Sequence, residues 1–334
     1  MKKFSFVLLI LILVFGVVGC TSNTPQTGPE KQEDQGAQAG YPTKAIQLIV
    51  PYAAGDNSDL SARTMADRVG SILSQPMVVV NKPGGGGSIG AAEVAKSAPD
   101  GHLILNGSYG LITAKPYMEE VGFSYESFKP IAQFTEIPLA LAVGKNAPFR
   151  TLPEFVDYAK ANPGKVRVSV PGAGTIQHIT MLGFCKDLGI DMKVMPYEGG
   201  GPALTAVLSK DVDAIFVGAG VLVGQYTSGD IKVIGATSPE RLDIMPDVPT
   251  FTEQGHDLLA GVWFGAFAPK DTPDEVIKTL EKTFKEIYDM PEVQEQWKKL
   301  NLQPSFLNSE EFSERVKQDA EKTYNILKEL GKAK

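Results

Sequence analysis

The chain has 334 residues, of which 43% are apolar, and this is enough to build one large or two medium-sized hydrophobic cores. Its 39 acidic residues outnumber its 32 basic ones and give a formal net charge of −7. This balance argues against nucleic acid or anionic lipid as the main partner, although backbone N–H groups can still bind a small anion.

The N-terminus has the pattern of a secretory signal. Two lysines precede a continuous apolar run over residues 4–18, and a glycine stands before Cys20. The run is short for a membrane-spanning helix, so we predict a signal peptide over residues 1–19. The tetrad Val-Val-Gly-Cys that ends at Cys20 resembles the bacterial lipobox, which predicts lipidation of this cysteine. A plain N-terminal membrane anchor is the alternative.

The segment 20–40 predicts a disordered tether, because after Cys20 it contains no large apolar residue that could be buried. No later stretch is apolar enough to cross a bilayer. The folded part is therefore expected on the extracytoplasmic face of the membrane, held there by the lipid alone. Once Cys20 is acylated, Cys185 is the one cysteine left, and we interpret it as a small buried hydrophobe.

Strands and helices alternate from residue 46 onward, which indicates an α/β fold with a parallel sheet. The apolar run 46–50 predicts a buried strand that ends at Pro51, and Asp59 is a suitable N-cap for the helix that follows. Further strands are predicted at 77–80, 102–105, 166–170, 193–196, 213–217 and 232–236. Two long apolar segments, 131–143 and 263–269, are interpreted as crossings between two lobes, and the tail is predicted to be helical.

Three strand-to-helix turns are rich in glycine, alanine or serine and contain few bulky side chains: 52–59, 83–90 and 171–178. Each follows the carboxyl end of a predicted parallel strand, where ligands bind in open α/β sheets. Turns 52–59 and 171–178 also aim free N–H groups and a helix dipole at one spot, which suits a carboxylate. Any one loop could be simple turn geometry, but the three together favour a binding cleft. Four aromatic residues nearby could wall a pocket or belong to the core: Tyr109, Tyr197, Trp263 and Phe264.

Other chemistries lack their motifs. The four glycines at 84–87 are not followed by Gly-Lys-Ser/Thr and do not have dinucleotide spacing, so nucleotide binding is not expected. The histidines His102, His178 and His256 are far apart and form no zinc motif, and there is no Gly-x-Ser-x-Gly. His178 could bond a ligand from a helix N-terminus, whereas the other two are interpreted as structural. We expect no enzyme, no metal and no cofactor.

These motifs resemble those of the tripartite tricarboxylate transporter substrate-binding proteins, also called the Bug family of extracytoplasmic solute receptors. The resemblance runs in order from residue 41 to about residue 270. It is carried by Tyr41-Pro42, Gly55, Asp59, Ala62-Arg63, Asn81-Lys82-Pro83-Gly84, Gly86-Gly87-Ser88-Ile89-Gly90, Pro99-Asp100-Gly101, Asn162-Pro163-Gly164, Gly172, Gly174-Thr175, His178, Pro196-Tyr197, Gly199, Pro246-Asp247-Val248-Pro249-Thr250, Trp263-Phe264-Gly265 and Ala268-Pro269.

The resemblance implies the type II periplasmic-binding-protein fold, in which two α/β lobes joined by two crossings close over a ligand. We expect lobe 1 to comprise 41–138 and 260–334, and lobe 2 to comprise 139–259. Family members mostly hold small carboxylates through main-chain groups and hydroxyls. The ligand-binding residues implied here are Ala54, Gly55, Asp56, Asn57, Ser58, Gly86 and Ser108 on lobe 1, and Gly172, Ala173, Gly174, Thr175, His178 and Tyr197 on lobe 2.

The resemblance also implies a partner, a membrane permease pair to which a monomeric receptor delivers a small carboxylate. A receptor for a membrane sensor kinase is the alternative within the same class. A lyase on the two-lobe scaffold and a surface adhesin or structural lipoprotein are alternatives from other classes.

One position departs from the family pattern, because Gly55-Asp56 stands where two glycines are usual. Aspartate tolerates a positive φ better than most residues, so the turn is expected to survive. The carboxylate of Asp56 would lie close to the expected anion site. We therefore expect that Asp56 either points outward or selects a ligand that also carries an amine or a hydroxyl.

Overall fold

The structure of the protein, a computed structural model, describes residues 40–334. The predicted signal peptide over 1–19, the lipidation site Cys20 and all but the last residue of the tether lie outside these residues. Within the described part of the chain, no helix combines the length and the apolar character that a bilayer crossing requires.

The first half-sheet has the strand order β2-β1-β3-β9-β4, with β10 on the outer side of β4. Strand β1 pairs in parallel with β2 and β3, whereas β9 runs antiparallel to both β3 and β4. The strands unique to this half are β1 (Ile46–Val50), β2 (Met77–Asn81), β3 (Leu103–Ser108), β9 (Gly261–Pro269) and β10 (Gln303–Leu307).

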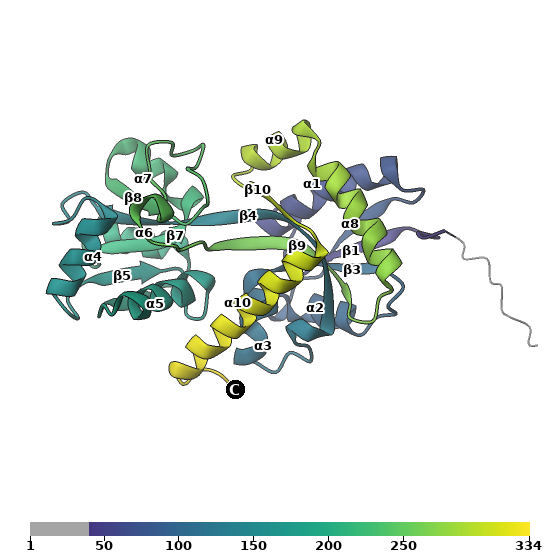
Figure 1. Ribbon diagram of the computed structural model, residues 1–334, viewed down its shortest axis with the longest axis horizontal. Helices are drawn as coiled ribbons and strands as arrows, with labels where there is room; N and C mark the ends of the chain where they lie inside the picture. Colours follow the sequence, from purple (N-terminus) through teal and green to yellow (C-terminus); the bar gives the residue numbers. More distant parts are fainter. Residues whose placement is uncertain (1–39) are drawn as a thin grey trace, which may run out of the picture. The chain divides into compact units, whose positions relative to one another are not determined.

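Strand β4 (Phe128–Gly144) belongs to both halves of the structure and changes partners at Pro138. Its first part pairs with β9 as far as the pair of Pro138 with Gly261, and from Leu139 onward it pairs with β7 and β8. The second half-sheet therefore has the order β8-β4-β7-β5-β6 (Figure 1). Its own strands are β5 (Arg167–Val170), β6 (Lys193–Pro196), β7 (Ala214–Gly218) and β8 (Ile231–Ala236).

The strand directions bring the carboxyl ends of the two half-sheets to face each other. Strand β4 is antiparallel to β9, which is antiparallel to β3, so β1 and β3 point along β4 toward the second half. Strand β7 is antiparallel to β4. Strand β5 is parallel to both β7 and β6, so all three strands point back toward the first half. The turns that follow β1 and β5 therefore lie on opposing edges, as a ligand site between the halves requires.

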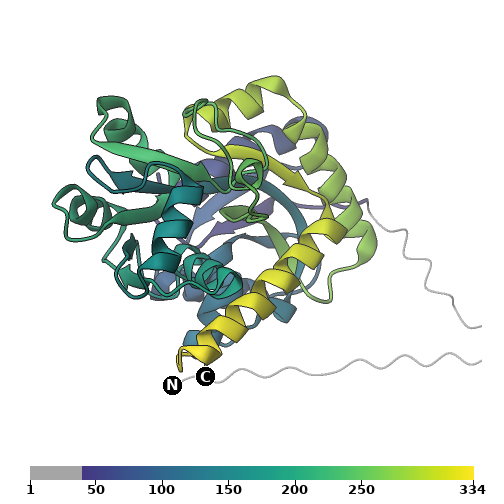
Figure 2. The ribbon, with the colours of Figure 1, turned by 60° about the vertical axis from the view of Figure 1, so that its left-hand side comes forward.

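Helices cover both faces of the sheets. In Figures 1 and 2, α1, α8 and α9 lie on one side of the first half-sheet, and α10 crosses the other side from β4 toward α3 and α5. The helices are α1 (Asn57–Ile72), α2 (Ser88–Ala95), α3 (Lys115–Met118), α4 (Leu152–Ala161), α5 (Ile176–Leu188), α6 (Gly200–Leu208), α7 (Val223–Ser228), α8 (Asp274–Tyr288), α9 (Pro291–Lys299) and α10 (Ser309–Glu329). Short 3-10 or π turns lie at η1 (Gly85–Gly87), η2 (Gly110–Ala114), η3 (Tyr125–Ser127), η4 (Ala219–Leu222) and η5 (Thr252–Gln254).

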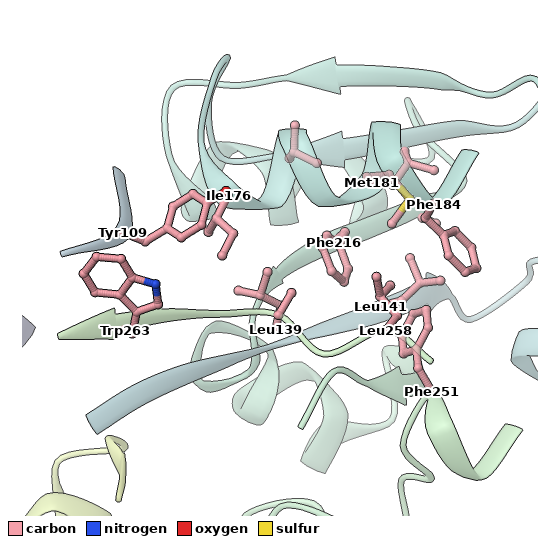
Figure 3. Close-up of a cluster of buried hydrophobic side chains, with 14 of the residues drawn as sticks. Tyr109, Leu139, Leu141, Ile176, Met181, Phe184, Phe216, Phe251, Leu258 and Trp263 are labelled. Atoms are coloured by element: carbon pink, nitrogen blue, oxygen red, sulfur yellow. The ribbon is translucent and has the colours of Figure 1, made fainter. Parts of the chain in front are cut away.

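The hydrophobic core continues from one half into the other. Successive residues of β3 alternate between the two faces, so Leu105 packs with one cluster and Ile104 with another. The cluster that contains Leu105 also includes Leu139 of β4 and reaches Phe216 and Phe251 in the second half (Figure 3). The two halves are therefore joined by packed side chains as well as by backbone.

Most of the predicted strands are found within one residue of their expected bounds. The third strand differs, because it continues to Ser108 instead of ending at residue 105. The predicted crossings fall inside β4 and β9. The expectation of a wholly helical tail is wrong, since the tail contains β10, an edge strand formed by pairing with β4. The division of the chain into lobes at 138/139 and 259/260 stays a prediction.

Candidate functional site

The turn after β1 leads directly into α1, but the helix is not capped as expected. It begins at Asn57, and its N-cap is Asp56, whose Oδ1 accepts a hydrogen bond from the Asp59 amide over 2.8 Å. The expectation that Asp59 caps the helix is therefore wrong. The turn does not depend on the tolerance of aspartate for a positive φ, because Asp56 has a φ of −77° while Gly55 takes the left-handed value of +88°.

Asp59 instead holds the turn from inside. It is buried and accepts hydrogen bonds from the Gly55 amide at 2.8 Å, from Arg63 Nε at 2.9 Å and from Asn81 Nδ2 at 2.8 Å. Burial acts to raise the pKa of Asp59, but the hydrogen bonds from Arg63, Gly55 and Asn81 outweigh it and lower the pKa. A permanently ionised Asp59 therefore fixes the backbone on which Ala54 and Asn57 stand exposed.

Asp56 places a second carboxylate at the same helix end. Burial raises its pKa, even though the amides of Asp59 and Ser58 donate to it. The side chain is half-buried and bonded to the first turn of α1, so the structure does not have the outward-pointing Asp56 that was one of the two alternatives, and selection of a ligand with an amine or a hydroxyl stays a prediction. Among residues 40–334, neither Asn57 nor Ser58 has a backbone acceptor for its amide, but the Ser58 amide donates to Asp56, so the Asn57 amide is the donor that this helix end keeps free.

The two serines expected in the site are engaged within the first half. Ser58 is buried, and both its carbonyl and its hydroxyl accept hydrogen bonds from Asn106 Nδ2 at 2.9 Å. Ser108, at the end of β3, shares a 3.0 Å hydrogen bond with the hydroxyl of Tyr52. These contacts tie the turn after β1 to the end of β3, so Ser58 and Ser108 position the loop.

Gly86 lies exposed in the glycine loop before α2. All four glycines from Gly84 to Gly87 have a positive φ, a backbone conformation that glycine adopts without the steric cost that a side chain would add. A Cβ on Gly87 would lie 3.4 Å from Cβ of Pro51, so this loop packs against the end of β1. A Cβ on Gly86 would lie 3.1 Å from Nζ of Lys115, a residue that the sequence motifs did not single out.

The turn after β5 is closed by its own side chains. Thr175 is the N-cap of α5: its hydroxyl donates to the Gly172 carbonyl at 2.9 Å and accepts from the His178 amide at 3.3 Å. The hydroxyl proton of Thr175 is therefore already used. Ala173 is exposed, and in the described chain the amides of Ile176 and Gln177 have no backbone acceptor.

His178 braces this turn from the first helical turn of α5. Its Nδ1 accepts a hydrogen bond from the Gly174 amide at 3.1 Å, so the neutral ring carries its proton on Nε2. Burial, and then the positive charge of Lys332, lowers the pKa of His178. The ring is therefore neutral near pH 7 and can offer a ligand only an N–H donor.

Tyr197 follows β6 and is half-buried. Its amide donates to the Val170 carbonyl at 2.8 Å, which extends the pairing of β5 with β6. Its ring packs beside the apolar cluster that includes Leu204 and Val217. Of the other aromatic candidates, Trp263 and Phe264 are buried core residues.

The glycine loop after β2 and the turn after β5 are approached by a common element, the short helix α3. Lys115 of α3 lies against Gly86, and a Cβ on Gly174 would lie 2.6 Å from Sδ of Met118. The structure thus brings Ala54 to Ser58, Gly86 and Ser108 together in one half and Gly172 to His178 in the other. Among the described residues, no hydrogen bond links these two groups directly.

A cavity of about 610 Å³ lies near these turns, and none of the predicted ligand residues lines it. Its lining includes Tyr109, Ile176 and Ile179, which directly follow Ser108, Thr175 and His178 in the chain. Its charged lining residues are Glu136, Glu240, Arg315, Asp319 and Lys322.

Internal pairing accounts for the best-buried of these charges. Arg315 Nη2 lies 2.7 Å from Glu136 Oε1, and Trp263 Nε1 donates to Asp319 at 2.8 Å. Burial raises the pKa of Asp319 although Arg315 and Trp263 both favour its ionised form. No sequence motif indicates this network, because its members are spread over β4, β9 and α10.

The fold defines a two-lobed solute-binding protein of the periplasmic type. The sequence model of the tripartite tricarboxylate transporter family receptor matches residues 61–332, so the chain belongs to this family. Receptors of this family are extracytoplasmic, bind small carboxylates and work with the membrane components of a transporter; they are not enzymes.

Individual proteins agree with this assignment. A UPF0065 protein of Bordetella pertussis is 30% identical over 293 residues, which are 87% of this chain and 91% of that protein. A TctC solute-binding protein from Polaromonas, solved without ligand, is 29% identical with a TM-score of 0.79 and covers 86% of this chain and 99% of its own. MatC from Rhodopseudomonas palustris, solved with bound malate, is 27% identical with a TM-score of 0.62 and covers 86% of this chain and all of its own.

Proposed function

We propose that this protein captures a small organic acid, a di- or tricarboxylate or a related carboxylate, for a tripartite tricarboxylate-type secondary transporter. The observation that carries the proposal is the pair of helix N-termini after β1 and β5. Each stands at a strand end that points toward the opposite half, and each keeps backbone amides without backbone acceptors in the described chain. Such helix ends suit anionic groups.

The groups proposed to hold the ligand are mainly main-chain donors. On the first half these come from Ala54 and Asn57, and on the second from Gly172 and Ala173 together with the helix end after Thr175, because the amides of Gly55 and Gly174 already donate to Asp59 and His178. The hydroxyls of Ser58 and Thr175 are assigned to shaping these turns, and His178 Nε2 is a donor available to the ligand. The malate held by a relative supports this class of ligand.

A ligand that contacts both helix ends binds better when the two halves approach each other. It therefore shifts the population toward the closed arrangement, which the membrane components would recognise. We further propose that the protein stays on the extracytoplasmic face of the membrane through a lipid on Cys20, that residues 1–19 are removed, and that it works as a monomer.

The test is a thermal-unfolding screen against amino, hydroxy, di- and tricarboxylic acids. A ligand at a hundred times its dissociation constant adds about 2.7 kcal/mol of stability. For a domain of this size that is a rise in Tm of roughly 5 °C or more. A rise confined to one acid class supports the proposal and identifies the substrate. Protein that is folded, free of carried-over ligand and unaffected by every acid would contradict it.

A further inference from the structure

Helix α3 carries two side chains that approach both loops of the proposed site. Its first residue, Lys115, places Nζ 3.1 Å from a Cβ on Gly86, and its last, Met118, places Sδ 2.6 Å from a Cβ on Gly174. Residues three apart on a helix share one face, with Cβ atoms about 5–6 Å apart. Lys115 and Met118 thus face the two halves of the proposed site from one helix turn.

The position of α3 is set by the π-helical turn η2, which separates it from β3. Tyr109, the residue before η2, is buried, and its hydroxyl shares a 2.7 Å hydrogen bond with Thr323 of α10. The Thr113 hydroxyl donates to the Tyr109 carbonyl at 2.7 Å, which ties η2 to the same anchor. Single π turns inside helices often occur at functional sites, because the extra residue redirects the side chains that follow.

Lys115 is an ammonium with spare donors. Its side chain is 17% exposed, and its one hydrogen-bond partner within residues 40–334 is Glu119, at 2.8 Å. A lysine ammonium has three N–H donors, so two remain for another acceptor. Glu119 is 59% exposed and can turn into solvent, so it neutralises Lys115 without closing it off.

We propose that Lys115 binds a second carboxylate of the ligand, which makes the substrate a dicarboxylate. This inference rests on the proposed function: one carboxylate occupies the N-terminus of α5, and the other is held by Lys115 beside Gly86. Lys115 beside Gly86 brings an ammonium to the first half of the proposed site, and Met118 against Gly174 holds the same helix at the turn that opens α5. A Cβ at position 86 would come within 3.1 Å of Nζ, so glycine lets the ammonium lie directly against this loop.

The experiment measures binding by titration calorimetry on the full-length chain, purified in detergent. The probes are malate and succinate, and succinamate, in which one carboxylate of succinate is replaced by an amide. Lys115→Gln should weaken succinate and malate binding about 10- to 100-fold, the range for a hydrogen bond between charged groups. It should change succinamate binding by no more than roughly twofold, because that probe has no second carboxylate.

Three further variants make the result specific. Lys115→Arg keeps the charge and should retain most of the affinity for succinate. Glu119→Gln removes the competing carboxylate and should tighten succinate binding about twofold. Lys96→Gln, at the C-cap of α2, removes the same charge from the same half and should leave all three probes unchanged. Thermal unfolding of each variant verifies that it is folded.

The outcomes separate this inference from the proposed function. If the wild-type chain binds succinate or malate and Lys115→Gln binds them equally well, the role of Lys115 is overturned while the solute-binding function stands. Equal weakening of succinate and succinamate would also overturn it, because Lys115 would then only hold α3 in place. If the wild-type chain binds no acid in the wider screen, the proposed function fails and this inference fails with it.

Discussion

The carboxylate of Asp56 accepts a hydrogen bond from the backbone amide of Asp59 over 2.8 Å, and it thereby covers the N-terminus of α1. A ligand carboxylate at this helix end would meet a negative charge already in place. The first helix end is therefore less suited to a plain anion than the N-terminus of α5, where Thr175 caps the helix with a neutral hydroxyl. This difference supports a ligand group with an amine or a hydroxyl on the side of Asp56.

Replacing Asp56 by glycine should widen the acceptance of plain di- and tricarboxylates. The substitution removes the negative charge and frees the Asp59 amide, while an N-cap change to glycine costs only about a few tenths of a kcal/mol. Calorimetric titration of the same acid panel against both proteins measures the effect. Asp56→Asn serves as the control that keeps a capping oxygen without the charge. An unchanged ligand preference in both variants would mean that Asp56 only shapes the turn.

Gly174→Ala should destabilise the protein by more than Gly189→Ala. Both glycines have a positive φ, +74° and +62°, so alanine costs about 1–2 kcal/mol at either position. A Cβ on Gly189 meets open space, whereas one on Gly174 meets Met118 Sδ at 2.6 Å, which should add about 1 kcal/mol. Denaturant unfolding compares the two variants, and a double-mutant cycle with Met118→Ala isolates the contact. Equal losses of unfolding free energy in the two variants, with no coupling between Gly174→Ala and Met118→Ala, would contradict this prediction.

Stability should fall at acid pH in a way that depends on His178. Burial, and then Lys332, lowers the pKa of His178 below the ordinary 6.5, so the unfolded chain binds the proton more readily than the folded protein. The contribution of neutral His178 is complete above about pH 6.5 and is lost as the pH drops below that value.

Thermal unfolding of the wild type and of His178→Gln between about pH 5 and 7.5 tests this sign. The wild type should lose more stability on acidification than the variant. The pKa of His256 is also lowered by burial, but this residue titrates in both proteins and cancels in the comparison. Identical slopes would show that His178 is not protonated on unfolding in this range.

Asp319→Ala should destabilise the protein by about 1–3 kcal/mol, because it leaves the N–H of a fully buried indole without its acceptor. Asp319→Asn keeps an acceptor oxygen for Trp263 and should lose clearly less. Urea unfolding of the two variants measures the difference. Trp263 fluorescence should report the change in polarity around the ring. Similar losses in both variants would point to the charge of Asp319, and its contact with Arg315, as the important feature.

The strands were predictable because buried strands appear in the sequence as short, mainly apolar runs. Ile46–Val50, which is followed by Pro51 and a small polar turn, is an example. The N-cap residue of α1 was not predictable, because Asp56 and Asp59 are equally good capping residues by type. Tertiary contacts decide between them: Arg63 and Asn81 draw the Asp59 carboxylate away from the helix end. The local sequence therefore does not predict which of the two aspartates caps the helix.

The parts of the site that were missed depend on contacts over long separations. Strand β10 contains Pro304 and lacks alternation, and it forms because β4 offers a free edge. Lys115 belongs to no motif, although it is the one basic residue between Lys96 and Lys129 and follows a strand end. Its place beside Gly86 depends on the π turn η2, which no residue pattern announces.

The seventeen residues of β4 serve as a strand in both half-sheets, and the cluster around Leu105 and Phe216 fills both halves. Neither half can therefore be exchanged between relatives or expressed alone as a folded fragment, since each would lose a strand and part of its hydrophobic core. Changes in ligand preference within such a scaffold are expected to come from single replacements on the facing turns and on α3, while both halves of the scaffold are kept together.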